Sequence, residues 1–238
     1  MIETTKAIVI NTIKYGDTSL IATCYTEKSG LKTYMLKGIL KAKKAKVKVA
    51  YFQPLMQLNI TANHNTKGTL NSIREIEVIN FYNSIYSDIK KQSIILFLAE
   101  TLYYSIKEEE QNASLFKYLE TSLLWLDTHE TVSNFHLLFL LNLSKYLGFY
   151  PETKNIDFPY FNLLEGKFTN TYKLNTISRE KITQFKKLLG INFDIIEQVN
   201  FSASNRQDIL AILIQYFEFH IEGFKKPKSL NVLKSVFS

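Results

Sequence analysis

The period of the hydrophobic pattern changes once along this chain, close to residue 80. Before that point, short runs rich in β-branched and aromatic residues are separated by turn signals such as Gly16-Asp17 and Ser29-Gly30, which is typical of strands. From Tyr82 onward, apolar residues recur every three or four positions, as they do on the packed face of a helix. The pattern predicts a β-rich domain at 1–80 and a helical domain at 81–238.

Five strands are expected in the first domain, because five apolar runs are bounded by turn residues. They are 6–16, 19–30, 31–39, a run at 47–52 that continues after Pro54 to about residue 62, and 68–79. Pro54 is placed at a bulge or an edge, since it has no N–H to donate to a ladder. Five short strands suggest a small closed barrel, and the OB-fold is the five-stranded barrel that binds oligonucleotides. The predicted fold class is a multidomain α and β protein, with a five-stranded OB-fold barrel followed by an all-α helical domain.

Six helices are expected in the second domain. They are 85–106, 114–128 with Ser114 as its N-cap, 132–151 with Gly148 and Pro151 at its end, 178–190, 203–224 and 229–237. The third of these is apolar nearly all round, so we expect it at the buried centre. The stretch 152–174 is less regular, and a hairpin is expected at Glu165–Gly166.

Positive charge is concentrated near the front of the chain and at its last residues. The window KGILKAKKAKVK, residues 37–48, holds six lysines and no acid, although the lysine content of the chain would give such a window about one. Residues 1–82 carry twelve Lys and Arg against five acids, and residues 223–238 carry four against none, whereas residues 83–222 carry thirteen against seventeen. An AT-rich genome explains the preference for Lys over Arg but not the clustering. The asymmetry favours a polyanion-facing front on a neutral or acidic body.

Two interpretations of this lysine run stay open: the lysines either form the solvated edge of a sheet or bind a polyanion. Lys46 and Lys48 alternate with valine and are expected to share one strand face, whereas residues 40–46 suggest an exposed loop that could follow a phosphate backbone. Tyr34 is either a stacking partner for a base or an ordinary packing residue of the barrel. The expected DNA-binding residues are Lys37, Lys41, Lys43, Lys44, Lys46 and Lys48, with Lys14, Lys32 and Tyr34 beside them and a basic tail of Lys225, Lys226 and Lys228.

The sequence offers no constellation of catalytic or metal-ligating residues. The Gly166-Lys167 pair lacks the first glycine of a phosphate-binding loop, since Phe161 stands there, and the four histidines are scattered. His136, on the most apolar helix, is either a packed core residue or a ligand, and Cys24 is expected in the core. The carboxylates of residues 107–112 are expected at a solvated helix end. We expect no enzyme activity, no cofactor and no metal.

The single cysteine and the lack of a secretory signal or of an apolar run of about 18 residues favour a cytoplasmic protein, associated with the nucleoid and without a membrane contact.

Three stretches resemble one known family. YGDTSLIATCYTEKSGLKTYMLKGI at 15–39, the basic loop and YFQPLMQLNI at 51–60 resemble, in order, the amino-terminal pattern of the bacterial RecO family. FHLLFLLNLSKYLGFYP at 135–151 is similar to its central helix, and GFKKPKSLNVLKSVF at 223–237 to its carboxyl end. The resemblance covers essentially the whole chain.

This resemblance implies an OB-fold domain, a helical domain, and the function of a DNA repair and recombination mediator. Such a protein binds single- and double-stranded DNA, anneals complementary strands, and acts with RecR and often with the acidic tail of the single-strand-binding protein to load the RecA recombinase at gaps. Two alternatives stay open: a non-catalytic OB-fold module for another polyanion such as structured RNA, and a scaffold that docks an acidic protein.

Many members of the family carry a four-cysteine zinc site after the central helix, and here residues 155–170 contain no cysteine. Phe158, Tyr160 and Phe161 are expected to fill that space instead. Ser133 and Asn134 precede the central helix, where basic residues would receive the acidic tail, so no tail pocket is assigned from the sequence.

Overall fold

The amino-terminal part of the chain is a five-stranded antiparallel sheet that curls toward a barrel. The computed structural model describes residues 1–41, 48–65, 70–177 and 179–238. The strands are β1 Ile2–Tyr15, β2 Ser19–Thr26, β3 Gly30–Leu36, β4 Gln57–Asn63 and β5 Ser72–Val78, in the order β3-β2-β1-β4-β5. The two edges approach where Asn71 forms a parallel bridge to Tyr34, with backbone hydrogen bonds to Thr33 and Met35. This topology matches the predicted OB-fold class.

The central strand β1 is buried on both faces. Ala7 and Val9 point into the barrel, whereas Ile8 and Ile10 belong to the hydrophobic core of the helical domain. The register between β1 and β2 shifts between Val9 and Asn11. The barrel and the helical domain therefore share one strand.

Residues 49–52 were predicted to start the fourth strand, and that prediction was wrong. Val49–Phe52 forms a short 3₁₀ helix, η1, in which Phe52 is buried and Val49 is exposed. Leu55 then takes a positive φ of 60° and donates its N–H to the Val9 carbonyl, which leads the chain into β4. A short apolar run has no periodicity that separates a strand from a helical turn, so the sequence did not distinguish them.

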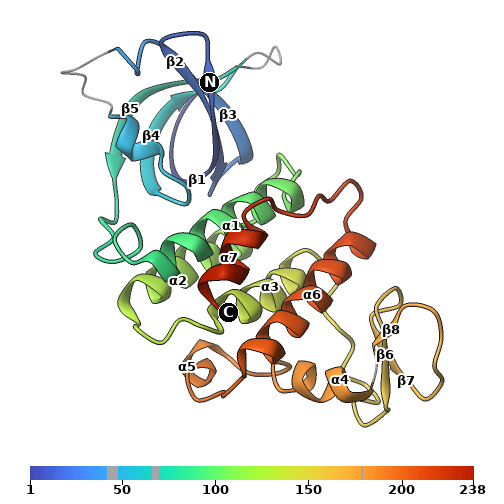
Figure 1. Ribbon diagram of the computed structural model, residues 1–238. Coiled ribbons are helices and arrows are strands. Elements are labelled where there is room, and N and C mark those ends of the chain that lie inside the picture. Colours follow the sequence, from blue (N-terminus) through green and yellow to red (C-terminus); the bar gives the residue numbers. More distant parts are fainter. Residues whose placement is uncertain (42–47, 66–69, 178) are drawn as a thin grey trace.

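The helical domain follows, and Figure 1 shows the barrel standing on its first helices, with α7 alongside α1. Its helices are α1 Ile89–Ser105, α2 Ala113–Thr128, α3 Phe135–Tyr146, α4 Arg179–Lys186, α5 Phe193–Ile196, α6 Ala203–His220 and α7 Leu230–Val236. Helix α3 is buried along nearly its whole length, as expected. The N-cap of α2 is Asn112, whose side chain accepts from Leu115 N–H, and not the predicted Ser114. In the described ranges, no helix combines the length and apolar character needed to cross a bilayer.

The second domain is not all-α, because a small antiparallel sheet lies at its end away from the barrel (Figure 1). Its strands are β6 Tyr160–Asn162, β7 Lys167–Thr169 and β8 Thr176–Ile177. The predicted hairpin at Glu165–Gly166 is confirmed: Gly166 has a φ of 66° and its N–H donates to the Asn162 carbonyl. The third strand, β8, was not predicted, because two residues leave too short a pattern to be recognised in a sequence.

The segment 107–112 joins the two domains at the start of β3. Gly30 has a φ of 62°, and a Cβ there would lie 2.4 Å from the carbonyl oxygen of Glu110. The N–H of Leu31 donates to the Glu108 carbonyl at 3.1 Å. Residues 107–111 are exposed after the end of α1, as expected, and their backbone also packs closely on the barrel. Only glycine combines the positive φ with so close an approach.

A second contact between the domains is built around the carboxylate of Glu120 in α2. Its side chain is 8% exposed, and it pairs with Lys6 of β1 at 2.7 Å and with Lys117 at 2.8 Å. Burial alone would raise the pKa of Glu120, but the hydrogen bonds from Lys117 and Lys6 outweigh it and hold the pKa below its usual value. The charges at this contact are therefore paired within the protein.

The connection from the barrel to α1 is held by Asp127, near the end of α2. Its carboxylate accepts the backbone N–H groups of Asn83, Ser84 and Ile85 at 2.8 to 3.1 Å. Burial works against the charged form, but these hydrogen bonds prevail and lower the pKa of Asp127. The 107–112 segment, Glu120 and Asp127 thus add polar contacts to the shared strand β1 in joining the barrel to the helices.

Candidate nucleic-acid interface

The end of the barrel that points away from the helices is formed by the β1–β2 turn and by the residues that follow β3. Gly38 N–H donates to Ser19 Oγ at 3.2 Å, and Leu40 N–H donates to the Thr18 carbonyl at 2.9 Å. Ile39 inserts into the barrel core, where it is 7% exposed. The segment 37–41 is therefore held beside the β1–β2 turn. We call this region the open end of the barrel.

Three of the predicted lysines, Lys14, Lys37 and Lys41, are exposed here, and a fourth, Lys48, is exposed beside η1. Lys14 lies near the end of β1, Lys37 and Lys41 flank the buried Ile39, and Lys48 precedes η1. Among the described residues, none of these four ammonium groups has an acidic partner or a hydrogen bond. The sequence has no acid between residues 28 and 74, and Asp17 is the one acid of the β1–β2 turn. Unpaired lysines of this kind can neutralise phosphates and release their counterions.

Part of the predicted lysine run cannot be placed in this way. Lys43, Lys44 and Lys46 lie outside the described residues. Lys46 and Lys48 were expected to share a strand face, but Lys48 is the N-cap of η1 and not part of a strand. Lys48 is exposed, whereas Lys46 and Val47, with which it was expected to alternate, lie outside the described residues.

Lys32 and Tyr34 do share a face of β3, as the alternation predicted, but that face is the interior of the barrel. Tyr34 is 0% exposed, and its hydroxyl is 3.0 Å from His64 Nε2. A ring buried in this way cannot receive a base, so its alternative role as a packing residue is correct. Lys32 lies at the opposite end of the barrel, which rests on the helical domain and which we call the covered end. Its 19% exposed side chain pairs there with Glu109 at 3.1 Å. Neither residue belongs to the open end.

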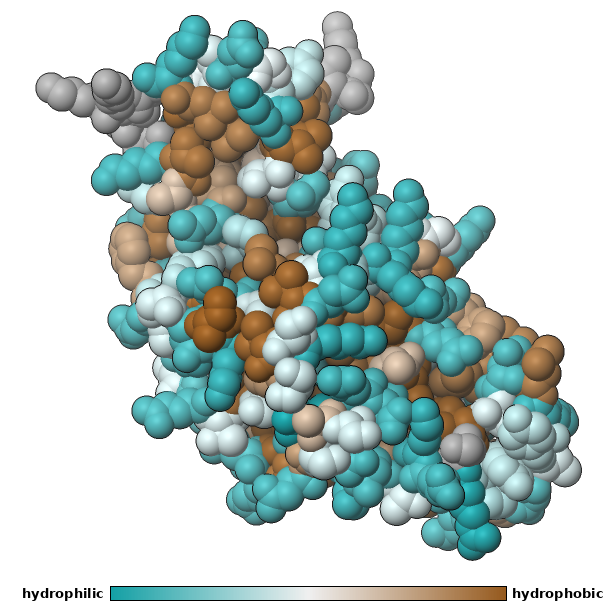
Figure 2. Space-filling view, in the orientation of Figure 1, coloured by the Kyte–Doolittle hydropathy of each residue, from teal (hydrophilic) through white to brown (hydrophobic). Residues whose placement is uncertain are grey.

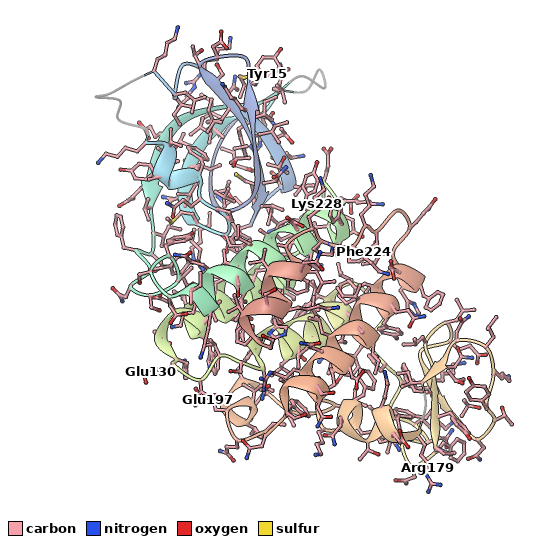
Figure 3. All side chains as sticks on the ribbon, viewed as in Figure 1. Tyr15, Glu130, Arg179, Glu197, Phe224 and Lys228 are labelled. Carbon is pink, nitrogen blue, oxygen red and sulfur yellow. The ribbon has the colours of Figure 1, made fainter. Side chains whose placement is uncertain are left out.

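The basic tail lies elsewhere. Figure 3 shows Lys228 at the junction between the barrel and the helices, whereas Tyr15 is at the far end of the barrel. Lys228 lines a cleft of about 350 Å³ together with residues of β1 and α1. Lys226 pairs with Glu218 at 3.4 Å, and Lys225 is exposed. The structure does not bring the tail lysines together with those of the open end.

The residues considered for other chemistry are buried. Burial raises the pKa of the Cys24 thiol to about 12. Burial, and to a smaller extent Arg206, lowers the pKa of His136 to about 3, so its imidazole is neutral and packs between Phe97 and Phe237. Within the ranges that the structure describes, no group of three or more His, Cys, Asp or Glu side chains is placed to hold a metal ion.

Comparison with known proteins identifies the family. The model of the "Recombination protein O N terminal" family matches residues 1–82, and that of "Recombination protein O C terminal" matches residues 86–230. The chain belongs to the RecO family. It is 47% identical to the DNA repair protein RecO of Flavobacterium johnsoniae and 45% identical to that of Flavobacterium psychrophilum, covering 98% of each chain. The DNA repair protein RecO of Bacteroides fragilis is 36% identical over the full length of both chains.

In this RecO-family chain, the stretch that lacks the four cysteines folds into the small sheet β6–β8. Phe161 is fully buried and packs against Phe168, Phe185 and Tyr216, with ring centroids 4.9 to 5.9 Å apart. Of the aromatics expected to fill this space, Phe161 takes the centre and Phe158 packs at its edge, whereas Tyr160 contacts Tyr172. An aromatic cluster thus stands at this position of the RecO fold.

The structure adds Tyr15 to the open end of this RecO-family barrel, which the sequence interpretation did not single out. Tyr15 is the last residue of β1 and is 56% exposed. Figure 2 shows hydrophobic side chains on the visible face of the barrel, bordered by hydrophilic ones toward its end. A signal was present in the sequence: an aromatic residue beside a lysine, directly before the Gly16-Asp17 turn, is placed where a turn exposes its neighbours.

Proposed function

We propose that this RecO-family protein is a DNA repair and recombination mediator that acts by binding and not by catalysis. It binds single- and double-stranded DNA through the lysines of the open end and anneals complementary strands. With RecR and the single-strand-binding protein, it helps to load the RecA recombinase at gaps in the chromosome, in the cytoplasm. The unpaired lysines support the proposed DNA contacts, and membership of the RecO family supports the proposed partners.

The observation that carries this proposal is the difference in pairing between lysines of the same barrel. Lys6 and Lys32 are held by carboxylates of the helical domain, and their charge is used within the fold. The exposed Lys14, Lys37 and Lys41 of the open end, and Lys48 beside η1, have no such partner among the described residues. Lysines with no internal use, in a stretch of sequence without acids, fit a polyanionic ligand.

Phosphate contacts also account for annealing in physical terms. Two complementary strands repel each other through their phosphates, and a cluster of cations lowers that repulsion when both strands are bound. Contacts to phosphates position a strand without reading its bases. The base edges therefore stay available for pairing with the second strand.

The test is an annealing assay on complementary oligonucleotides coated with the cognate single-strand-binding protein. We expect the full-length protein to accelerate annealing well above the spontaneous rate, and more so when RecR is present. Coated strands that anneal no faster with the protein than without it would contradict the proposed function.

A competition experiment separates the alternatives. Single-stranded DNA, a structured RNA and an acidic tail peptide are each titrated against one labelled DNA strand. We expect single-stranded DNA to displace the label at the lowest concentration. Structured RNA acting at a lower concentration would assign the open end to RNA, and binding of the peptide without any DNA binding would assign a scaffold role.

A further inference from the structure

We propose that the unpaired bases of single-stranded DNA stack on Tyr15 and lie against an apolar row formed by Ile13, Ile21 and Met35 on the outer face of the barrel. This inference rests on the proposed function, and it names the groups that would make the protein distinguish an unpaired strand from a duplex. The lysines hold the phosphates of either form, whereas Tyr15 needs a base face that a duplex keeps inside its stack.

Within the part of the chain that the structure describes, the Tyr15 ring takes no part in the packing of the fold. Other tyrosines have ring partners: Tyr25 stacks on Phe116 at 6.2 Å, and Tyr103, although 42% exposed, contacts Tyr104 at 5.5 Å. Within the described ranges, Tyr15 has neither a ring contact nor a side-chain hydrogen bond, and it belongs to neither hydrophobic core. A strand end holds this large apolar surface in water, where it gains nothing from the rest of the protein.

The strand register continues this surface below Tyr15. Side chains alternate along β1, so Ile13 and Tyr15 lie on one face while Lys14 lies on the other. Ile13 is paired across the sheet with Ile21, which is paired with Met35. Leu20 and Leu36, their neighbours along the strands, pack into the barrel core, so the row faces outward. Ile13 is 52% exposed, and Ile21 and Met35 are half-buried.

The same outer face is covered nearer to the helices. There Ile8 and Tyr25 are paired across β1 and β2, and both are buried in the core of the helical domain. Beyond the register irregularity at Val9/Asn11, a polar row of Asn11, Thr23 and Thr33 comes first, and the apolar row follows it toward the open end. The exposed apolar row thus lies on the same face as the interface with the helices, separated from it by one polar row.

The surrounding charges identify the occupant as nucleic acid. Lys14 neighbours Tyr15 in sequence, and Lys37 and Lys41 are held beside the β1–β2 turn by the hydrogen bonds of Gly38 and Leu40. Asp17 is the acid nearest in sequence. A base stacked on Tyr15 carries its phosphates toward cations that lack acidic partners. This combination of an aromatic ring, apolar surface and unpaired cations is the platform on which OB-folds bind single strands.

The test compares three variants of the full-length protein on oligothymidylate of about 20 nucleotides and on a duplex of the same length. We expect Tyr15→Leu to lose about 5- to 100-fold in affinity for the single strand and to bind the duplex as before. Tyr15→Phe keeps the ring and should bind both forms like the parent. The matched control is Tyr172→Leu, which removes an exposed tyrosine beside another lysine, Lys173, and should change neither affinity.

Two further readouts separate stacking from other causes. The slope of log affinity against log salt should stay unchanged in Tyr15→Leu, because no phosphate contact is lost. In a Tyr15→Trp variant, the added tryptophan fluorescence, measured against the parent protein with Trp125 alone, should be quenched by single-stranded DNA and not by duplex. Ile13→Gln should produce a smaller loss, restricted to the single strand.

The outcomes distinguish this inference from the proposed function. A parent protein that binds no DNA would overturn both. Parental single-strand affinity in Tyr15→Leu, with DNA binding by the parent intact, would overturn the stacking inference alone. An equal loss for single strand and duplex, or a lowered melting temperature that accounts for the loss, would also overturn it. Loss of binding to an apolar protein partner with unchanged DNA affinity would assign the row to that partner.

Discussion

At the end of the barrel that rests on the helices, Lys6 and Lys32 reach the carboxylates of Glu120 and Glu109. Lys14, Lys37 and Lys41 at the open end, and Lys48 before η1, reach none among the described residues. Lys6 and Lys14 lie on the same strand, so the difference between them comes from what faces each end of the barrel. A lysine near an acid of its own chain serves the fold, and a lysine without one is free to bind a ligand.

The largest effect is expected at the covered end, from Gly30→Ala. The new Cβ would lie 2.4 Å from Glu110 O and occupy a backbone at φ 62°, so we expect the free energy of unfolding to fall by about 2 to 5 kcal/mol. Urea denaturation measures this. Gly16→Ala is the matched control, because its φ is 58° and a Cβ there would meet no described atom within 4 Å. Equal losses in both variants would mean that the close approach of residues 107–112 contributes nothing.

The next effect is expected at the open end, from the quadruple variant Lys14→Ala, Lys37→Ala, Lys41→Ala and Lys48→Ala. If two or three phosphate contacts are lost, the salt slope on single-stranded DNA should become shallower by about 1.4 to 2.1, and affinity at 0.1 M salt should fall by about 20- to 100-fold. The melting temperature should hardly change, since surface substitutions usually cost less than about 0.5 kcal/mol each.

The matched control for this variant removes four exposed lysines of the helical domain, namely Lys154, Lys167, Lys173 and Lys187. It loses the same net charge far from the open end. A parental slope in the open-end variant, or the same change of slope in both variants, would remove the distinction between the two ends of the barrel.

A smaller effect on stability is expected from Glu120→Gln, which breaks the paired charges at the covered end. We expect a loss of about 1 to 2 kcal/mol in the free energy of unfolding at pH 7 and unchanged DNA affinity. Because the pKa of Glu120 is lowered in the folded protein, its contribution is present above the unfolded value of 4.5 and is lost as the pH falls through the folded pKa.

Urea denaturation of the parent and Glu120→Gln between pH 7 and pH 3 tests this sign. The difference between the two proteins should shrink below about pH 4.5. A difference that stays constant down to pH 3 would show that the Glu120 carboxylate does not stabilise the contact through its charge.

The smallest effect is expected from Lys32→Ala. Its pair with the 75% exposed Glu109 should contribute less than about 1 kcal/mol to stability, and the salt slope of DNA binding should stay at the parental value. The single variant Lys37→Ala at the open end serves for comparison. If Lys32→Ala made the salt slope of DNA binding as shallow as Lys37→Ala does, Lys32 would belong to the DNA site and its assignment to the covered end would be contradicted.

Much of the fold could be predicted from the sequence, because its longer elements carry clear periods. The β1–β2 and β2–β3 turns, the buried helix α3 and the hairpin at Gly166 follow from local patterns. The helix η1 and the strand β8 did not, since two to four residues do not display a period. The exposed position of residues 107–111 after α1 was predicted, but their contact with Gly30 was not, because it joins residues about 80 positions apart.

The candidate site was predicted in part. The exposed lysines follow from clustering, which needs no tertiary information. Alternation correctly placed Lys32 and Tyr34 on one face but did not say that this face is the interior of the barrel. For the same reason the outward-facing Tyr15 was missed, although it lies one residue from a predicted lysine.

Strand β1 contributes Ala7 and Val9 to one core and Ile8 and Ile10 to the other. Neither core can lose this strand and remain intact, so we expect the barrel and the helices to unfold in a single cooperative transition. Thermodynamic linkage then acts on the whole chain, because a ligand that binds only the native state raises the stability of everything that unfolds with its site. DNA held at the far end of the barrel should therefore slow amide hydrogen exchange in the buried helix α3, which lies in the other core.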